Sequence, residues 1–226
     1  MPQEFMSTLN TGIKNVRNVL RYTIGPGSIS ELPNILSSRC KSKDSPVIFF
    51  IDEFFRSRPN IISRLSMKEC DRAIYVPTIN EPSTCQVDKI VQQLHKDGLN
   101  KPAAIVGMGG GITMDVAKAV ANLLTNGGHA EDYQGWDLVN HPAIYKVAIP
   151  TLSGTGAEAT RTCVMTNKRI GLKLGMNSDF TVYDEIIMDP ELTATVPRNQ
   201  YFYTGMDAFI HCVEALAGSY RNAIGD

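Results

Sequence analysis

The sequence predicts an α/β fold in which a doubly wound parallel sheet is followed by a helical segment. Two features of the chain predict it. Short apolar segments rich in β-branched residues alternate with helical segments from about residue 45 to residue 149, which is typical of successive β–α units. After Asp189 and Pro190 the strand-like segments stop, and the remaining residues have a helical pattern.

The expected strands and helices follow from the hydrophobic pattern and from the positions of proline and glycine. Residues 45–51, SPVIFFI, have the pattern of a buried strand because the run is short, β-branched and aromatic. The other expected strands cover residues 18–24, 72–76, 102–107 and 145–149. Helices are expected from residue 28 or 30 to residue 38, and over residues 54–65, 87–96 and 113–124.

The composition excludes several classes of protein. A hydrophobic share of 43% suffices for a packed core, and 22 basic against 23 acidic residues give no indication of a nucleic-acid or membrane partner. The five cysteines show no CxxC spacing, so we expect neither disulfides nor a cysteine zinc site. No signal-peptide segment and no apolar run long enough to cross a bilayer is evident. We therefore expect a soluble, cytoplasmic protein.

A glycine-rich turn, Gly107 followed by Gly109–Gly111, lies between an expected strand and an expected helix. Such a turn lets the backbone approach a phosphate, and the helix amino terminus adds free N–H groups and partial positive charge. The spacing matches neither the GxGxxG fingerprint nor a Walker loop, so a tight turn without a ligand is the alternative. Asp115 would cap the helix or contact the ligand. Lys118 would do either, or be solvated.

Two further segments would complete a nucleotide site. Asp52 ends the strand at residues 45–51, where its carboxylate could accept hydrogen bonds from an adenine ribose and repel the 2′-phosphate of NADP. A helix N-cap is the alternative for Asp52. Residues 150–160 form a second loop rich in glycine and hydroxyl side chains, which can bond a pyrophosphate or ribose. A plain Ser/Thr turn is the alternative there.

Asp207 and His211 lie four residues apart in the final helical segment, so both project from one helix face. A carboxylate and an imidazole side by side offer half of a divalent-metal site. The alternative is a helix that simply carries polar residues. Glu214 falls on the same stripe and would either orient a ligand or be an ordinary surface carboxylate.

In this order and at this spacing, the motifs resemble those of the iron-containing, or group III, alcohol dehydrogenases. The shared text is GGG…D.AK from Gly109 to Lys118, PT..GTG.E from Pro150 to Glu158, KLG at Lys173, DPEL at Asp189 and TGMDA..H..E from Thr204 to Glu214. The resemblance implies the dehydroquinate synthase-like fold, with a dinucleotide-binding α/β domain over residues 1–188. Residues 189–226 would begin an all-helical metal-binding domain, with the active site in the cleft between the two.

The resemblance also implies a set of functional residues. Asp207 and His211 would be two of four ligands of an iron or zinc ion, and we expect no catalytic residue beyond the metal ligands. NAD is the expected dinucleotide. Its expected contacts are Asp52, Gly109, Gly110, Gly111, Asp115, Thr151, Thr155, Thr160, Thr162 and Lys173.

Three departures from the family pattern stand out. Ile112 replaces the usual serine after the glycines, and Ala157 replaces the serine of GTGSE, so each removes a hydroxyl from the cofactor site. Family members are also much longer, and their other two metal-binding histidines lie beyond the part that matches. The remaining histidines, His95, His129 and His141, are expected on the surface.

We therefore expect this chain to be a fragment with weak metal binding and little activity. In such a fragment the apolar faces of Met206, Phe209, Ile210 and Val213 would be exposed, which favours aggregation or a homodimer.

Residues 181–216 resemble most the family branch that oxidises C8 of 3-deoxy-D-manno-octulosonate in lipopolysaccharide sugar synthesis. The implied reaction oxidises a primary alcohol of a sugar acid to an aldehyde. Because that branch is described as an oxidase, both NAD and oxygen stay open as electron acceptors. Rival enzymes on the same scaffold are dehydroquinate synthase and glycerol-type dehydrogenases, and a rival of another class is a non-catalytic nucleotide-binding module.

Overall fold

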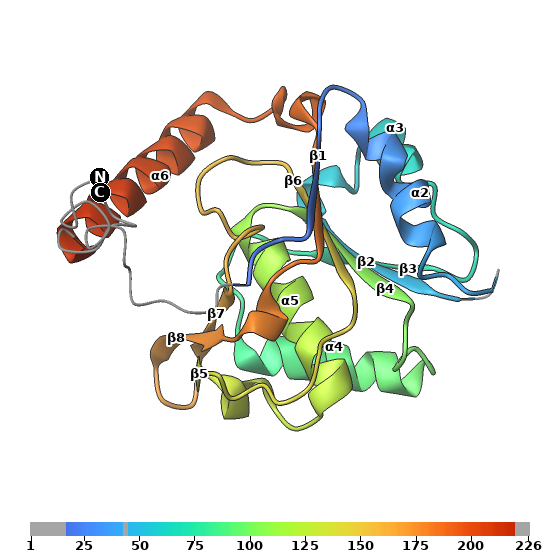
Figure 1. Ribbon diagram of the computed structural model, residues 1–226, viewed down its shortest axis with the longest axis horizontal. Coiled ribbons are helices and arrows are strands. Elements are labelled where there is room, and N and C mark those ends of the chain that lie inside the picture. Colours follow the sequence, from blue (N-terminus) through green and yellow to red (C-terminus); the bar gives the residue numbers. More distant parts are fainter. Residues whose placement is uncertain (1–16, 43–44, 220–226) are drawn as a thin grey trace, which may run out of the picture.

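The structure is a computed structural model that describes residues 17–42 and 45–219. A six-stranded sheet forms its centre, and every pair of neighbouring strands in it is parallel (Figure 1). In spatial order its strands are β1 (Arg21–Ile24), β9 (Glu185–Met188), β6 (Lys146–Pro150), β4 (Ala104–Gly109), β2 (Val47–Asp52) and β3 (Arg72–Val76). The predicted α/β fold with a parallel sheet is confirmed.

The central strands β2 and β4 are buried along their whole length, as expected where helices cover both faces of a parallel sheet. Alternate side chains of β2 enter different cores. Ile48 and Phe50 pack with α4 (Thr84–Lys96) and α5 (Gly111–Asn126). Val47, Phe49 and Ile51 pack with residues of η1 (Ser28–Glu31) and α2 (Leu32–Ser37).

The register of the sheet aligns the carboxyl ends of three strands. Ile51 of β2 lies opposite Met108 of β4, and Gly109 of β4 lies opposite Pro150 of β6. The residues that follow these strands therefore meet at one edge, which is where ligands bind to open parallel sheets.

The structure differs from the sequence-based expectation in three places. Strand β9, which lies between β1 and β6 in the central sheet, was not among the expected strands. The helix expected over residues 54–65 is broken into η2 (Glu53–Phe55), α3 (Pro59–Ile62) and η3 (Ser63–Leu65), because Pro59 can begin a helix but cannot continue one. A second sheet was not expected at all. In it β8 (Leu172–Asn177) lies between β5 (Gly135–Trp136) and β7 (Thr162–Asn167), and the β7–β8 pair is antiparallel. The short helices η4 (Ala130–Tyr133) and η5 (Asp179–Thr181) flank it.

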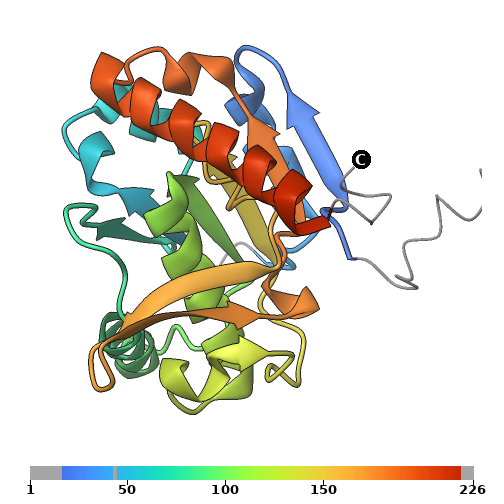
Figure 2. The same cartoon turned by 90° about the vertical axis from the view of Figure 1, so that its left-hand side faces the viewer.

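A single long helix, α6 (Arg198–Ser219), follows η6 (Pro190–Thr193) and runs along one side of the α/β body (Figures 1 and 2). Its apolar side chains are largely open to solvent. The predicted exposure is found at Met206 (40%), Phe209 (60%), Ile210 (48%) and Val213 (46%). Within the described ranges no helix is long and apolar enough to cross a membrane.

Candidate functional site

A cavity of about 420 Å³ lies at the carboxyl ends of β2, β4 and β6. Residues that follow these strands form one wall, and residues from η6 to the first turns of α6 form the other. Its lining consists of Asp52, Phe54, Phe55, Thr78, Gly109, Gly110, Gly111, Ile112, Met114, Pro150, Thr151, Leu152, Thr155, Glu158, Leu192, Thr195, Val196, Pro197, Gln200 and Thr204.

The glycine triplet forms the turn from β4 into α5, and all three glycines line the cavity. Gly109 has a φ of +157°, and a Cβ atom there would lie 2.7 Å from the Thr113 hydroxyl oxygen. A Cβ atom on Gly111 would lie 3.1 Å from the Thr155 side chain. Only glycine fits this path, and it leaves the first N–H groups of a 16-residue helix at the cavity. This wall therefore fits a phosphate group.

Gly107, by contrast, serves packing. A Cβ atom on Gly107 would lie 2.5 Å from the hydroxyl oxygen of Tyr183, which donates a hydrogen bond to the Met114 carbonyl at 3.0 Å. Tyr183 is fully buried against α5, so Gly107 makes room for the core and lies outside the cavity lining.

Asp52 is both a cap and a wall of the cavity. Its carboxylate accepts hydrogen bonds from the Phe54 N–H at 3.0 Å and from the Thr78 hydroxyl at 3.4 Å. The residue is 8% exposed, and burial raises the pKa of its carboxyl group above the ordinary value. The Asp52 side chain can therefore cap η2 and face a ligand in the cavity at the same time.

Four predicted cofactor contacts lie between the end of β6 and the start of β7, and two of them line the cavity. Thr151 and Thr155 line it, and the Thr151 N–H donates to the Gly109 carbonyl at 3.0 Å, which ties the two loops together. Thr160 and Thr162 lie outside the lining. They accept hydrogen bonds from Lys118 instead.

Lys118 is not solvated; it is fully buried. Its ammonium group donates to the Thr160 carbonyl at 2.8 Å, the Thr160 hydroxyl at 3.1 Å and the Thr162 carbonyl at 2.8 Å. Burial lowers the pKa of Lys118 below its ordinary value. A lysine is buried in this way only when its donors are satisfied, so Lys118 anchors the end of the hydroxyl-rich loop to α5.

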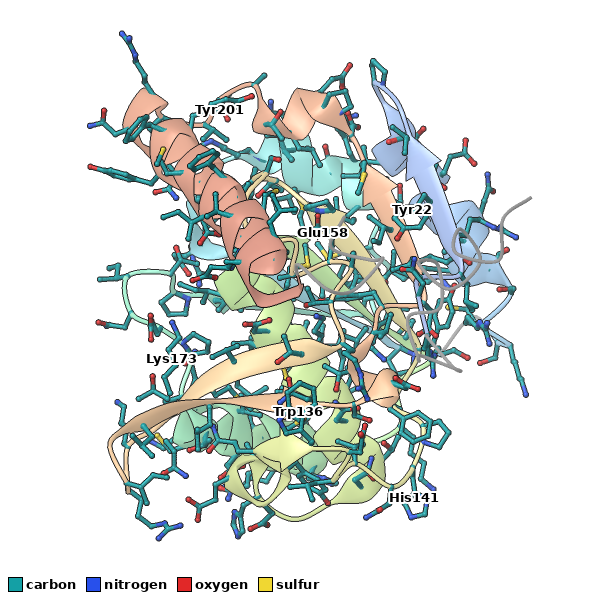
Figure 3. The ribbon with its side chains drawn as sticks, turned by 60° about the vertical axis from the view of Figure 1, so that its left-hand side comes forward. Tyr22, Trp136, His141, Glu158, Lys173 and Tyr201 are labelled. Carbon is teal, nitrogen blue, oxygen red and sulfur yellow. The ribbon has the colours of Figure 1, made fainter. Side chains whose placement is uncertain are left out.

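Asp115 and Lys173 also lie outside the cavity lining. The Asp115 carboxylate accepts a hydrogen bond from the Val164 N–H at 3.0 Å, so it joins α5 to β7. Burial raises the pKa of Asp115 to about 6. Lys173 forms an exposed ion pair with Glu81 at 2.5 Å, on the β7–β8 hairpin and apart from Glu158 (Figure 3). Direct cofactor contact by Asp115, Thr160, Thr162 and Lys173 stays a prediction that this placement does not support.

Asp207 and His211 project from one face of α6, with 3.8 Å between Oδ2 of Asp207 and Nδ1 of His211. Gln200 and Thr204, which line the cavity, lie on the same face by helical spacing. Oδ2 of Asp207 is buried yet has no hydrogen-bond partner within the described part of the chain. An orphaned carboxylate oxygen beside an imidazole fits a metal ion, although no group of three or more such donors occurs among residues 17–42 and 45–219.

The loop after β6 touches α6 through glycine. A Cβ atom on Gly154 would lie 2.7 Å from the Thr204 carbonyl oxygen, so the two backbones are in direct contact.

Glu214 is exposed on α6, as its surface interpretation expects, and His95, His129 and His141 are exposed as well.

Sequence reasoning missed several lining residues. Glu158 and Leu192 belong to the PT..GTG.E and DPEL motifs, so motif membership was the available signal. Phe54, Thr78, Thr195 and Val196 carry no such signal, because only the fold brings their loops to the edge of the sheet.

The doubly wound sheet, the glycine turn and the helix beyond the cavity define an α/β protein of the dehydroquinate synthase-like fold. The chain belongs to the iron-containing alcohol dehydrogenase family, whose model matches residues 20–190. It is 35% identical over 153 residues to the sulfoacetaldehyde reductase of Bilophila wadsworthia (strain 3_1_6), covering 68% of this chain and 39% of the relative. It is 30% identical over 206 residues to the NAD-dependent methanol dehydrogenase of Bacillus methanolicus, covering 90% of this chain and 52% of the relative.

Solved structures agree with this assignment. The crystal structure of sulfoacetaldehyde reductase from Bifidobacterium kashiwanohense in complex with NAD+ superposes with a TM-score of 0.75 and 25% identity, covering 90% of this chain and 53% of that one. A 1,3-propanediol oxidoreductase shares the fold with a TM-score of 0.78 and 24% identity, over 90% of this chain and 53% of that one. The chain thus spans about half the length of these structures.

Proposed function

We propose that this protein is a metal-dependent oxidoreductase that interconverts a primary alcohol and an aldehyde with NAD as the second substrate. The observation that carries the proposal is the pairing of two walls around one cavity. The glycine turn forms one wall, and the helix face that bears Asp207 and His211 continues from the other. A dinucleotide site and a metal site that share a cavity suit hydride transfer at a metal-bound alcohol.

The residues of the first wall would hold the dinucleotide. The turn at Gly109–Gly111 and the amino terminus of α5 would receive the pyrophosphate, with Thr151 and Thr155 beside it. Asp52 would accept hydrogen bonds from the adenine ribose and repel a 2′-phosphate, which favours NAD over NADP. When bound, NAD supplies the acceptor for the hydride. The rest of the cavity lining is largely apolar and would exclude water from the reacting carbon.

Asp207 and His211 would hold the metal ion, iron or zinc, together with ligands from outside the described residues. When bound, such an ion lowers the pKa of a substrate hydroxyl group. Two protein ligands bind an ion weakly, so we expect the 226-residue chain to have low metal affinity. The proposed domain division follows from these roles, with residues 1–188 for the dinucleotide and residues 189–226 as the start of a helical metal-binding domain.

The proposed substrate class is a small primary alcohol or its aldehyde. Relatives with this fold are named a sulfoacetaldehyde reductase, a methanol dehydrogenase and a 4-hydroxybutyrate dehydrogenase, all of which act on small molecules of this kind. C8 of 3-deoxy-D-manno-octulosonate is the narrower candidate, supported by the resemblance of residues 181–216. Small primary alcohols and the octulosonate each carry a primary hydroxyl group that the metal ion would bind, so one assay can compare them.

Calorimetric titration of NAD+, NADP+ and Zn2+ tests the proposal. We expect NAD+ to bind, NADP+ to bind more weakly, and Zn2+ binding to disappear in the variant Asp207→Ala/His211→Ala. Absorbance at the NADH wavelength, with methanol, 4-hydroxybutyrate and 3-deoxy-D-manno-octulosonate as substrates, then ranks the alcohols. Weak Zn2+ binding that the double substitution removes is the outcome expected of two ligands. NAD+ binding with the same Zn2+ response in the unmodified chain and in the double variant would favour the non-catalytic nucleotide-binding module.

A further inference from the structure

Glu158 is a second carboxylate of the cavity wall, in addition to that of Asp52. Asp52 and Glu158 are the charged side chains in the lining, and within the described residues no Lys, Arg or His joins them. The Asp52 carboxylate already accepts two hydrogen bonds. Glu158 makes no hydrogen bond or ion pair with any residue in the described ranges. Its carboxylate is therefore available to a ligand.

The two carboxylates lie on opposite sides of the glycine turn. Asp52 is the last residue of β2, the glycine turn starts at the last residue of β4, and the loop with Glu158 follows β6, while β4 lies between β2 and β6 in the sheet. Glu158 is thus on the side of the cavity away from the Asp52 carboxylate, in the space between α6 and the sheet (Figure 3). Lys118, a buried cation whose charge interacts with that of Glu158, donates its hydrogen bonds to Thr160 and Thr162 and forms no ion pair with Glu158.

This arrangement constrains the ligand that the cavity accepts, and the argument rests on the proposed function. Phosphate groups at the glycine turn would be repelled by a carboxylate, so each end of the cavity must receive a part of the dinucleotide that is neutral or positive. With the adenine ribose at Asp52, the nicotinamide half extends toward Glu158. The nicotinamide ring carries a positive charge in NAD+ and none in NADH.

We infer that Glu158 is a specificity-determining residue that favours the oxidised dinucleotide over the reduced one by attracting the positively charged nicotinamide ring. Such a preference raises the share of protein that carries NAD+, the form of the dinucleotide that alcohol oxidation requires. Glu158 is partly exposed, so solvent screens its attraction for the nicotinamide ring. We therefore expect the charge of Glu158 to change the ratio of the NADH and NAD+ dissociation constants by only about fivefold.

The test compares three ligands and three proteins. Dissociation constants of NAD+, NADH and ADP-ribose, which lacks the nicotinamide ring, are measured by calorimetry for the 226-residue chain, for Glu158→Gln and for Glu69→Gln. Glu69 is exposed and lies outside the cavity lining, so Glu69→Gln removes one negative charge without touching the site. Glutamine at residue 158 keeps the shape of the side chain and removes only its charge.

We expect Glu158→Gln to weaken NAD+ binding about fivefold and to change NADH and ADP-ribose binding less than about twofold. Glu69→Gln should change none of the three. Equal weakening of NAD+ and NADH with ADP-ribose unchanged would indicate an uncharged contact and would overturn the inference, as would no change at all. If the unmodified chain bound neither ADP-ribose nor NAD+, the proposed function would fail and this inference with it.

Discussion

The ammonium group of Lys118 donates a hydrogen bond of 2.8 Å to the main-chain carbonyl of Thr160, 42 residues further along the chain. This bond and its two companions pin the end of the loop after β6 against α5, and the same loop supplies Thr151, Thr155 and Glu158 to the cavity. Lys118, a buried cation outside the cavity lining, therefore holds in place the loop that forms part of the cavity wall.

Removal of this anchor should destabilise the fold. In Lys118→Met three oxygen atoms of Thr160 and Thr162 each lose the ammonium donor, and we expect the free energy of unfolding to fall by about 2–4 kcal/mol. Urea denaturation measures it. The matched control is Lys89→Met on the exposed face of α4, for which we expect a change within about 0.5 kcal/mol. Equal effects of the two substitutions would show that the buried bonds contribute nothing.

Stability should depend on pH through Asp115. Burial raises its pKa to about 6 from an ordinary value of 3.8, so between these values the folded state binds more protons than the unfolded state. The contribution of Asp115 to stability is fully present below the lower value and is lost as pH rises through the higher one. Asp115→Asn does not titrate and keeps an acceptor for the Val164 N–H.

We therefore expect Asp115→Asn to gain stability relative to the unmodified chain between about pH 4 and about pH 6, by up to about 3 kcal/mol. Urea denaturation at the two ends of this range measures the difference. A gap between the two proteins that stays constant with pH would mean that Asp115 titrates normally.

The path of the backbone at Gly109 should tolerate no side chain. In Gly109→Ala the new methyl group would meet Thr113 at 2.7 Å and the Asp52 Cβ atom at 3.0 Å, so we expect a loss of about 1–3 kcal/mol in stability. NAD+ affinity should fall with it, because the helix amino terminus moves. Gly205→Ala in α6 is the control: nothing lies within 4 Å of its Cβ position, and we expect it to gain up to about 1 kcal/mol. Thermal unfolding and NAD+ titration of both variants separate these outcomes.

The choice between NAD and NADP should depend on Asp52. Asp52→Asn keeps acceptors for the Phe54 N–H and Thr78 hydroxyl but removes the charge that repels a 2′-phosphate. We expect the ratio of NADP+ to NAD+ dissociation constants to fall on the order of tenfold. Glu53→Gln, one residue away and outside the cavity lining, should leave the ratio unchanged. An unchanged ratio in Asp52→Asn would remove Asp52 from the cofactor site.

Much of the sheet was predictable because its central strands are continuous apolar runs, as in VIFFI of β2 and AIV of β4. Short apolar runs bounded by turn signals are typical of buried parallel strands. The hairpin of β7 and β8 was missed because TCVMTN and LKLGMN mix polar and apolar residues and gain their strand structure from each other. The glycines, Asp52, Thr151 and Thr155 were predictable as neighbours because parallel strands end at a common edge.

The burial of Lys118 was not predictable, since its partners are carbonyl groups more than 40 residues away and a lysine within a motif is ordinarily solvated. The same holds for Thr160 and Thr162. The family resemblance implied that both contact the cofactor, but they accept hydrogen bonds from Lys118 of α5 instead.

The central claim is that the helix face of Asp207 and His211 adjoins the cavity formed by the glycine turn. Proton relaxation of NAD+ by protein-bound Mn2+ tests it directly, because relaxation falls steeply with distance from the ion. We predict that Mn2+ broadens the nicotinamide protons more than the adenine protons, and that Asp207→Ala/His211→Ala abolishes the difference. Equal broadening of both rings, or broadening that survives the double substitution, would contradict the account.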